Sequence, residues 1–377
     1  SGAELMLRKP YFSKVRRIVV KIGSSSLTEN GVLSAKKISS FASDISFLVK
    51  KKYEVIIVSS GAISAGAGLL GLKREKMSIP QKQGMAAVGQ TVLMKEYSKA
   101  FEKFSISVGQ ILLTEEDFKS RVRYINIRNT VNELLKLGVV PIVNENDTVA
   151  VNEIKVGDND TLSAYVTNTI DADLLILLTD IDGFYYNLSD EKCADIVEKI
   201  DSRVFSAAKG SGSVHGTGGM QTKLKAADMV TKSGKLLSIA KADEKSVISR
   251  VVLGEKIGTV FLPSEKYIHG KKRWISFNMQ VKGKIIVDEG ARKALVGANK
   301  SLLPGGVVGS TGKFSSGDGI EISDLNGVVF AKGITNYSSA EIEVIKGKKS
   351  IEIKKAFGES YYEELVHRDN MILINQG

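Results

Sequence analysis

Two lysines lie beside glycine-rich turns, where each could meet a phosphate group. Lys21 lies near the end of an apolar run and is followed by Gly23 and three serines in "VVKIGSSSL". Lys223 follows the glycines of "GSGSVHGTGGMQTK", in the expected first turn of an amphipathic helix. The N–H groups of a glycine turn or a helix start, together with an ammonium group, bind anions well. We therefore expect a phosphate site, although two ordinary surface turns would show the same residues.

The segment 143–160, "VNENDTVAVNEIKVGDND", concentrates five carboxylates and four asparagines in a chain with a formal net charge of +11. It lacks the spacing of glycine and glutamate that an EF-hand calcium loop requires. Carboxylates can instead bind an ammonium group, and amides can bind a carboxylate, so the composition suits a zwitterionic amino acid. A solvated hairpin between two strands is the alternative.

Several familiar sites are disfavoured by what the sequence lacks. Cys193 is the only cysteine, which rules out an internal disulfide and a thiolate-rich metal site. His215, His269 and His367 are far apart and give no support to a histidine zinc site or a serine triad. No G-x-x-x-x-G-K-[ST] motif is present, and "GAGLLG" (66–71) falls inside an expected helix rather than directly after a strand, which disfavours a dinucleotide site.

The composition is that of a globular protein, with 43% hydrophobic and 25% charged residues. No apolar run approaches the roughly 18 to 20 residues of a membrane helix and nothing resembles a signal peptide, so we expect a cytoplasmic protein without membrane contact. A length of 377 residues favours two domains. The basic excess is spread along the chain, so charge alone does not separate a nucleic acid from an anionic small molecule as partner.

The candidate residues would be positioned by short strands that alternate with helices. Apolar, β-branched runs typical of buried parallel strands lie at 17–22, 54–59, 139–144, 174–179 and 236–240. Helix-length segments between them lie at 34–51, with Ser34 as a cap, and at 80–103, 121–138 and 220–234. This alternation predicts an α/β fold with right-handed crossovers and helices on both faces of the sheet.

The pattern changes after residue 263. Residues 264–274 are polar and basic and are typical of a linker. Short strand-like pieces divided by glycine follow at 283–288, 306–312, 319–323, 327–333 and 339–345, which predicts a small β-rich domain. We therefore place one domain at 15–263 and a second at 275–377, joined by the linker.

Five ordered motifs also carry a family resemblance. They are "VVKIGSSSL", "VSSGAISAG", "NENDTVAVNEIKVGDNDTLSA", "LLTDIDGFY" and "GTGGMQTKLKAAD". Together they closely resemble the glutamate 5-kinases of the amino-acid kinase family, over about residues 15 to 262. From about residue 275, "VDEGARKAL", "SLLPGGV" and "GDGIEI" resemble the PUA domain. The resemblance implies a three-layer αβα sandwich with a mainly parallel sheet, followed by a small β-barrel.

The activity implied by the resemblance is transfer of the γ-phosphoryl group of ATP, with Mg²⁺, to the side-chain carboxylate of L-glutamate. The products would be glutamyl 5-phosphate and ADP, in the first step of proline biosynthesis. A carboxylate with a pKa of about 4.3 is already ionised at neutral pH and needs no general base, which suits a chain with few histidines.

The resemblance also implies three groups of site residues, by motif position. The catalytic group would be Lys21, Lys223 and Asp160, in which the aspartate orients the two lysines. Glutamate would be held by Ser60, Gly61, Asn144, Asp147, Asp158 and Asn159. The nucleotide would be held by Lys21, Gly23, Ser24, Thr179, Asp180, Thr217, Gly218, Gly219, Met220, Gln221, Thr222 and Lys223. No residue is assigned as a metal ligand.

The resemblance implies further partners and leaves alternatives open. The acyl phosphate would pass to a glutamyl phosphate reductase, and the protein would form a homo-oligomer, a dimer or a tetramer. One alternative is another kinase of the same fold, acting on carbamate, aspartate, acetylglutamate or a nucleoside monophosphate. The other is an RNA-binding protein that works through its PUA domain, although the interleaved arginine and aromatic residues expected for base stacking are absent.

Overall fold

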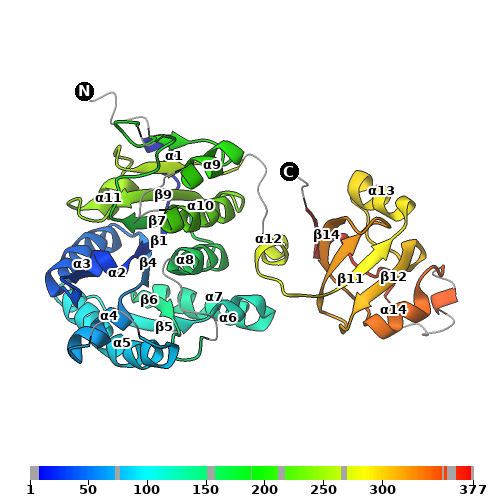
Figure 1. Ribbon diagram of the computed structural model, residues 1–377, viewed down its shortest axis with the longest axis horizontal. Coiled ribbons are helices and arrows are strands. Elements are labelled where there is room, and N and C mark those ends of the chain that lie inside the picture. Colours follow the sequence, from blue (N-terminus) through cyan, green and yellow to red (C-terminus); the bar gives the residue numbers. More distant parts are fainter. Residues whose placement is uncertain are drawn as a thin grey trace. The chain divides into compact units, whose positions relative to one another are not determined.

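The computed structural model divides the chain into two compact units. The first comprises Ser1–Phe118 and Val122–Tyr267, and the second comprises Lys119–Arg121 and Ile268–Gly377. The described residues are 8–72, 77–150, 158–187, 189–210, 217–264, 270–349, 352–354 and 362–374. Figure 1 shows the elements of both units.

The first unit is built on an eight-stranded sheet with the order β5-β6-β4-β1-β7-β9-β10-β8. Its strands are β1 (Arg17–Ile22), β4 (Glu54–Ser59), β5 (Val108–Leu113), β6 (Val140–Glu145), β7 (Leu174–Thr179), β8 (Ile196–Val197), β9 (Leu236–Lys241) and β10 (Thr259–Phe261). Among the described pairings of this sheet, only that of β9 with β10 is antiparallel. The expectation of a mainly parallel sheet is confirmed.

Helices cover both faces of this sheet and make three layers. The helices on one face are α3 (Ala35–Lys50), α5 (Ile79–Glu102) and α11 (Val247–Val252), which share a hydrophobic core with the sheet. Those on the other face are α7 (Arg121–Lys136), α8 (Asp158–Thr169), α9 (Ser202–Gly210) and α10 (Thr217–Thr231), around a second core. Figure 1 shows α3 and α11 on one side of the sheet and α8 and α10 on the other.

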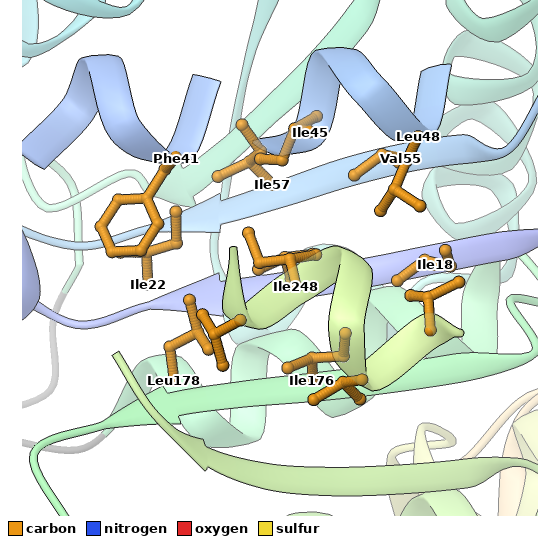
Figure 2. Close-up of a cluster of buried hydrophobic side chains, with 14 of the residues drawn as sticks. Ile18, Ile22, Phe41, Ile45, Leu48, Val55, Ile57, Ile176, Leu178 and Ile248 are labelled. Carbon is orange, nitrogen blue, oxygen red and sulfur yellow. The ribbon is translucent and has the colours of Figure 1, made fainter. Parts of the chain in front are cut away.

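The central strands are apolar on both faces because each face is buried under helices. In β1, Ile18 and Ile22 lie in the core shared with α3, α5 and α11, whereas Val19 lies in the core of the opposite face. Figure 2 shows the first of these cores, where Phe41 and Ile45 of α3 lie over β1 and β4. The alternation matters for the site, because Lys21 must lie on the same face as Val19.

Local sequence signals begin the two long helices of the first core. The Ser34 hydroxyl accepts a hydrogen bond from the Lys37 N–H at 3.4 Å, so the expected cap is present at the start of α3. Ser78 and Gln81 form a capping box at the start of α5. Such reciprocal bonds satisfy N–H groups that the first helical turn leaves unpaired. The helices expected at 34–51, 80–103, 121–138 and 220–234 are all observed, with small shifts of their ends.

Smaller elements complete the first unit. They are α1 (Lys9–Phe12), α2 (Ser24–Leu27), the hairpin of β2 (Thr28–Glu29) and β3 (Val32–Leu33), α4 (Ala62–Leu69) and α6 (Glu115–Lys119). Because α4 covers most of "GAGLLG", Gly66 and Gly68 lie in a helix, as expected, and do not form a dinucleotide turn directly after a strand. None of the described helices is long and apolar enough to cross a membrane.

The second unit contains a five-stranded sheet with the order β12-β11-β13-β14-β15. Its strands are β11 (Val281–Val287), β12 (Val307–Gly312), β13 (Gly319–Ser323), β14 (Val329–Ile334) and β15 (Met371–Leu373), and its helices are α12 (Gly270–Phe277), α13 (Glu289–Ala298) and α14 (Ser339–Ile345), with 3₁₀ turns at Pro304–Gly306 and Arg368–Asn370. Ile285, Ile320, Ile322 and Phe330 lie in its own hydrophobic core.

The structure differs from two expectations for this part of the chain. The segment 339–345 is the helix α14 and not a strand. Ser338 and Glu341 form a capping box at its start, and Ile342 and Ile345, three residues apart, are both buried on one face of the helix. The expected linker 264–274 is partly helical, because α12 begins at Gly270 and buries Trp274. Residues 265–269 of that linker lie outside the described residues.

Candidate active site

The parallel strands of the first unit end at one edge of the sheet, where α/β proteins place their ligands. Because β1, β4, β6 and β7 run in the same direction, their last residues are neighbours there. The candidate residues at or just after these ends are Lys21, Gly23 and Ser24 for β1, Ser60 and Gly61 for β4, Asn144 for β6, and Thr179 and Asp180 for β7. Sequence motifs that are far apart along the chain thus meet at one edge.

Asp160 lies between the two candidate lysines. It is in the first turn of α8, the helix that covers the face on which Lys21 lies. Lys21 Nζ is 3.0 Å from Asp160 Oδ1, and Lys223 Nζ of the neighbouring helix α10 is 3.1 Å from Asp160 Oδ2. The Thr222 hydroxyl donates a hydrogen bond to the same Oδ2 at 2.8 Å. The structure therefore brings all three residues of the expected catalytic group together.

This cluster is buried and carries a net positive charge. Asp160 is fully buried, and Lys21 and Lys223 are 7% and 8% exposed. Burial lowers the pKa of Lys21 below its ordinary value, and the nearby Lys223 ammonium adds to that effect, whereas Asp160 opposes it. Burial alone would raise the pKa of Asp160, but the two ammonium groups and the Thr222 hydroxyl hold it below its usual range. Within this cluster two cations face one anion, so a bound anion could match the remaining charge. Asp180, at the end of β7, is a further negative charge that acts on Lys21.

Asn159 joins the start of α8 to the end of β4. Its Nδ2 donates hydrogen bonds to Ser60 Oγ at 2.7 Å and to the Ser59 carbonyl at 3.0 Å. A carbonyl can only accept, so the amide nitrogen is the end that faces β4 and Oδ1 is left to accept from an ammonium group. Ser60 Oγ already accepts from Asn159 and can donate its own hydrogen to a carboxylate. The pair has the donor and acceptor that an amino acid backbone requires.

Gly61 directly precedes the helix α4 beside this pair. Its φ angle is +97°, in the left-handed region that favours glycine. The conformation turns the chain sharply from the end of β4 into α4, so Ser60 stays at the edge of the sheet. Gly61 thus shapes the site through its backbone, whether or not it contacts a substrate.

The "NEND" motif supplies a second polar group at the end of β6. Asn144 is 2% exposed, its Oδ1 accepts from the Glu145 N–H at 2.8 Å, and its Nδ2 donates to Gln90 Oε1 at 2.8 Å. Asp147 lies half-buried just beyond the strand. Asp158 is the first residue of α8, but its side chain lies outside the described part of the structure, as does the segment 151–157 that would form the expected hairpin.

The expected nucleotide residues lie on both sides of the lysine cluster. Gly23 directly precedes α2, which begins with Ser24, and a Cβ at Gly23 would lie 3.5 Å from Lys21 Nζ, so the glycine leaves the ammonium accessible from this turn. Thr179 Oγ1 donates to Asp180 Oδ1 at 3.0 Å at the end of β7.

Helix α10 forms the other side of the nucleotide site. It begins at Thr217 and includes Gly218, Gly219, Met220, Gln221, Thr222 and Lys223. Lys223 therefore lies in the second turn, not in the first as expected, because the helix starts before Met220. A Cβ at Gly219 would meet nothing within 4 Å, so the backbone is open to an approaching ligand. The glycine-rich stretch 211–216 before the helix lies outside the described residues.

Two residues of α5 that the sequence analysis missed contact the substrate side. Gln90 bonds to Asn144, and Tyr97, which is fully buried, has its hydroxyl 3.0 Å from Ser59 Oγ. Gln83, seven residues before Gln90, donates from Nε2 to the Ala150 carbonyl at 3.2 Å. The spacing of seven from residue 83 to 90 to 97 places all three on one helix face, and this polar stripe was the signal available in the sequence.

Comparison with known families agrees with this architecture. The model of the amino acid kinase family matches residues 16–240, and the model of the PUA domain matches residues 283–357.

Curated relatives narrow the assignment. A glutamate 5-kinase of Caldanaerobacter subterraneus subsp. tengcongensis is 47% identical over 366 residues, which are 96% of this chain and 98% of the relative. A glutamate 5-kinase of Dictyoglomus thermophilum is 48% identical over 369 residues, with the same coverage. The chain therefore belongs to the amino acid kinase family and, within it, to the glutamate 5-kinase family.

Solved structures show weaker similarities. Carbamate kinase from Giardia lamblia bound to AMP-PNP has a TM-score of 0.49 and 19% identity, and covers 67% of this chain and 100% of its own. UMP kinase from Bacillus anthracis has a TM-score of 0.44 and 16% identity, and covers 67% of this chain and 99% of its own.

Proposed function

We propose that the protein is an ATP-dependent glutamate 5-kinase, which transfers the γ-phosphoryl group of ATP to the side-chain carboxylate of L-glutamate. The name and high coverage of the curated relatives support this activity. The observation in the structure that carries it is the buried cluster of Lys21, Asp160 and Lys223, with a surplus positive charge at the carboxyl edge of the sheet. The products would be glutamyl 5-phosphate and ADP, in the first step of proline biosynthesis.

The chemistry needs alignment and charge neutralisation more than proton transfer. The acceptor carboxylate is ionised at neutral pH, since its ordinary pKa is about 4.3, and no base has to activate it. Negative charge is spread over the phosphoryl oxygens as the group moves, and positively charged donors fixed in place stabilise it. Lys21 and Lys223 are fixed by the carboxylate between them, so they would meet the phosphates without rearranging.

Glutamate would be bound by its two ends. Its α-ammonium group would meet Asn159 Oδ1 and the carboxylates of Asp147 and Asp158, and its α-carboxylate would accept from Ser60 and from the Asn144 amide. The side-chain carboxylate would then point toward Lys21 and Lys223. A substrate without an ammonium group would offer no donor to Asn159 Oδ1, which favours an amino acid over carbamate.

The nucleotide would bind between the Gly23 turn and α10. Ser24 would line the Gly23 turn, and Thr179, Asp180 and the start of α10 from Thr217 to Lys223 would form the nucleotide side, with N–H groups of the helix start as donors to the phosphates. Gly219 allows the close approach that this requires.

Mg²⁺ would enter together with ATP. The described residues contain no group of three or more acidic, histidine or cysteine side chains that could hold a metal. Mg²⁺ commonly uses one or two protein carboxylates together with substrate phosphates, so the donor set fits an ion held mainly by the nucleotide. When bound, such an ion would neutralise charge on the phosphate oxygens.

The acyl phosphate product is easily hydrolysed, so we propose that a reductase takes it up directly. This partner and the homo-oligomer stay predictions from the family resemblance, and the cytoplasmic location stays a prediction from the sequence. The sheet of the second unit does not favour RNA binding over a structural role for that unit.

Hydroxylamine trapping tests the activity. Protein, ATP, Mg²⁺ and L-glutamate with hydroxylamine should yield glutamyl hydroxamate, whereas aspartate, acetylglutamate or carbamate in place of glutamate should yield far less product. Absence of hydroxamate above a control without enzyme would reject the proposed function.

A further inference from the structure

We propose that Gln90 of α5 is a positioning residue for the amino-acid site, which fixes the direction of the Asn144 amide so that its N–H group faces the substrate carboxylate. The inference deepens the proposed function and rests on it, because it takes Asn144 as a substrate contact. Gln90 itself would not touch glutamate.

A chain of three hydrogen bonds sets the direction of each amide. The Glu145 backbone N–H can only donate, and it lies 2.8 Å from Asn144 Oδ1. The other end of the amide, Nδ2, must then face Gln90, whose Oε1 accepts at 2.8 Å. Gln90 Nε2 in turn donates to Gln110 Oε1 at 3.0 Å. One backbone group therefore determines the order of donors and acceptors along the whole chain.

The consequence for Asn144 is a directed donor. Its nitrogen carries two hydrogens, and the bond to Gln90 uses one of them. The second is left for an anionic group of the substrate. Reversing the amide would set two donors together at Glu145 and two acceptors together at Gln90, and both contacts would be lost.

Gln90 can hold this direction because its backbone is immobilised. The preceding residue, Gly89, packs so closely on α4 that a Cβ there would lie 1.7 Å from the Ala62 carbonyl oxygen. The helix α4 begins at the site, directly after Gly61. The same contact thus positions Gln90 relative to Ser60, which would donate to the same substrate carboxylate as Asn144.

The first test replaces Gln90 by a side chain of similar shape without polar atoms. We expect Gln90→Met to raise the KM for glutamate about tenfold, which corresponds to roughly 1.4 kcal/mol, with the KM for ATP unchanged. Thr91→Ala is the matched control, because Thr91 is exposed on the same helix and its hydroxyl bonds, within the described part of the chain, only to the Val88 carbonyl of that helix. It should leave both KM values unchanged. Equal KM values for glutamate in the wild type and Gln90→Met would overturn the inference.

Two charged variants separate positioning from simple electrostatics. Gln90→Glu keeps an acceptor for Asn144, whereas Gln90→Lys offers only donors. A general electrostatic effect on an anionic substrate would give the lysine variant the lower KM for glutamate. The positioning role predicts the opposite order, with the glutamate variant closer to the wild type. A lower KM in Gln90→Lys would contradict it, and this comparison decides the matter even if Gln90→Met does not fold.

A double-mutant cycle with Asn144→Ala distinguishes this inference from the proposed function. Once Asn144 is removed, Gln90→Met should have no further effect on the KM for glutamate, because the two residues act as one unit. An unchanged KM in Asn144→Ala would remove Asn144 from the proposed substrate site. A raised KM in Asn144→Ala together with additive effects in the double variant would leave that site intact and overturn the role of Gln90.

Discussion

Asp160 holds two lysines in place without cancelling their charge. Each carboxylate oxygen faces one ammonium group, at 3.0 Å from Lys21 and 3.1 Å from Lys223. Two buried ammonium groups would repel each other if Asp160 were absent, and breaking a buried pair typically costs about 3–5 kcal/mol. The arrangement therefore keeps two cations ready for phosphate at a site where neither would be stable alone.

Removing Lys223 should reduce catalysis much more than stability. In Lys223→Met, Asp160 keeps Lys21 and the Thr222 hydroxyl as partners, whereas the phosphoryl group loses a cation. We expect kcat to fall at least about 100-fold, as is common when one such stabilising donor is removed. The matched control is Lys225→Met, two residues along the same helix, where the side chain is exposed. Steady-state kinetics and thermal unfolding of both variants check this. A kcat of Lys223→Met comparable to that of the wild type would exclude Lys223 from the mechanism.

The lowered pKa of Lys21 predicts pH-dependent nucleotide binding. Only the protonated form attracts phosphate, and the pKa lies below its ordinary value of 10.5 because the side chain is buried. Affinity for a nonhydrolysable ATP analogue should thus be highest at neutral pH and weaken as pH rises through this lowered pKa. The loss should occur at a lower pH than that at which an exposed lysine loses its proton.

Calorimetric titration of the wild type and Lys21→Met between about pH 7 and 10 checks the sign. The variant should bind more weakly at neutral pH and lose less affinity as pH rises. A parallel pH dependence in both proteins would attribute the effect to other groups.

Short motifs made the central residues of the site predictable. Lys21 and Lys223 each lie within a few residues of glycines, so residue type and spacing selected them, whereas Asp160 was selected only through the family resemblance. Gln90 and Tyr97 were missed because their partners, Asn144 and Ser59, are distant in the sequence. Such contacts arise only when α5 packs on the sheet.

At the scale of elements, the contact of α4 with α5 connects the substrate site to the core. The backbones meet at Gly66 and Gly89, where a Cβ would lie 2.0 Å from the Met85 carbonyl oxygen and 1.7 Å from the Ala62 carbonyl oxygen. Only glycine allows this approach. Any larger residue must push α4, and with it Ser60 and Gly61, away from its place.

We expect Gly89→Ala to lower both stability and affinity for glutamate. Inserting a methyl group into a packed contact typically costs about 1–3 kcal/mol. The control is Gly84→Ala on the same helix, where a Cβ would meet nothing within 4 Å. That variant should be more stable by about 0.5–1 kcal/mol, because alanine favours the helix over glycine. Denaturant unfolding and glutamate kinetics measure both, and equal stabilities for the two variants would refute the packing account.

Buried elements were easier to predict than edge elements. The strands β1, β4, β7 and β9 are continuous apolar runs, which is what burial on both faces requires. β5 was missed because it is an edge strand, half-buried, and carries Gly109 and Gln110 among its apolar residues. The segment of α14 has strand-like composition, and only its capping box indicates a helix.

At the scale of the whole molecule, the candidate catalytic residues all belong to the first unit. That unit has its own hydrophobic cores on both faces of its sheet, and the second unit has a separate core. A chain ending at residue 264 should therefore fold cooperatively and retain hydroxamate formation within about tenfold of the full chain, since each unit buries its own core. Circular dichroism and the trapping assay check this. A truncated chain that folds but forms no hydroxamate would mean that the second unit completes the site.

The most direct test of the central claim follows an oxygen atom from glutamate to phosphate. L-Glutamate with its side-chain carboxylate labelled with ¹⁸O is turned over with ATP and trapped with hydroxylamine, and the released phosphate is measured by ³¹P NMR. Because hydroxylamine attacks the carbonyl carbon, the bridging oxygen stays on phosphorus. We predict one ¹⁸O atom in each phosphate released with hydroxamate, and none when only the α-carboxylate is labelled. Phosphate without ¹⁸O from the side-chain label would contradict transfer to that carboxylate.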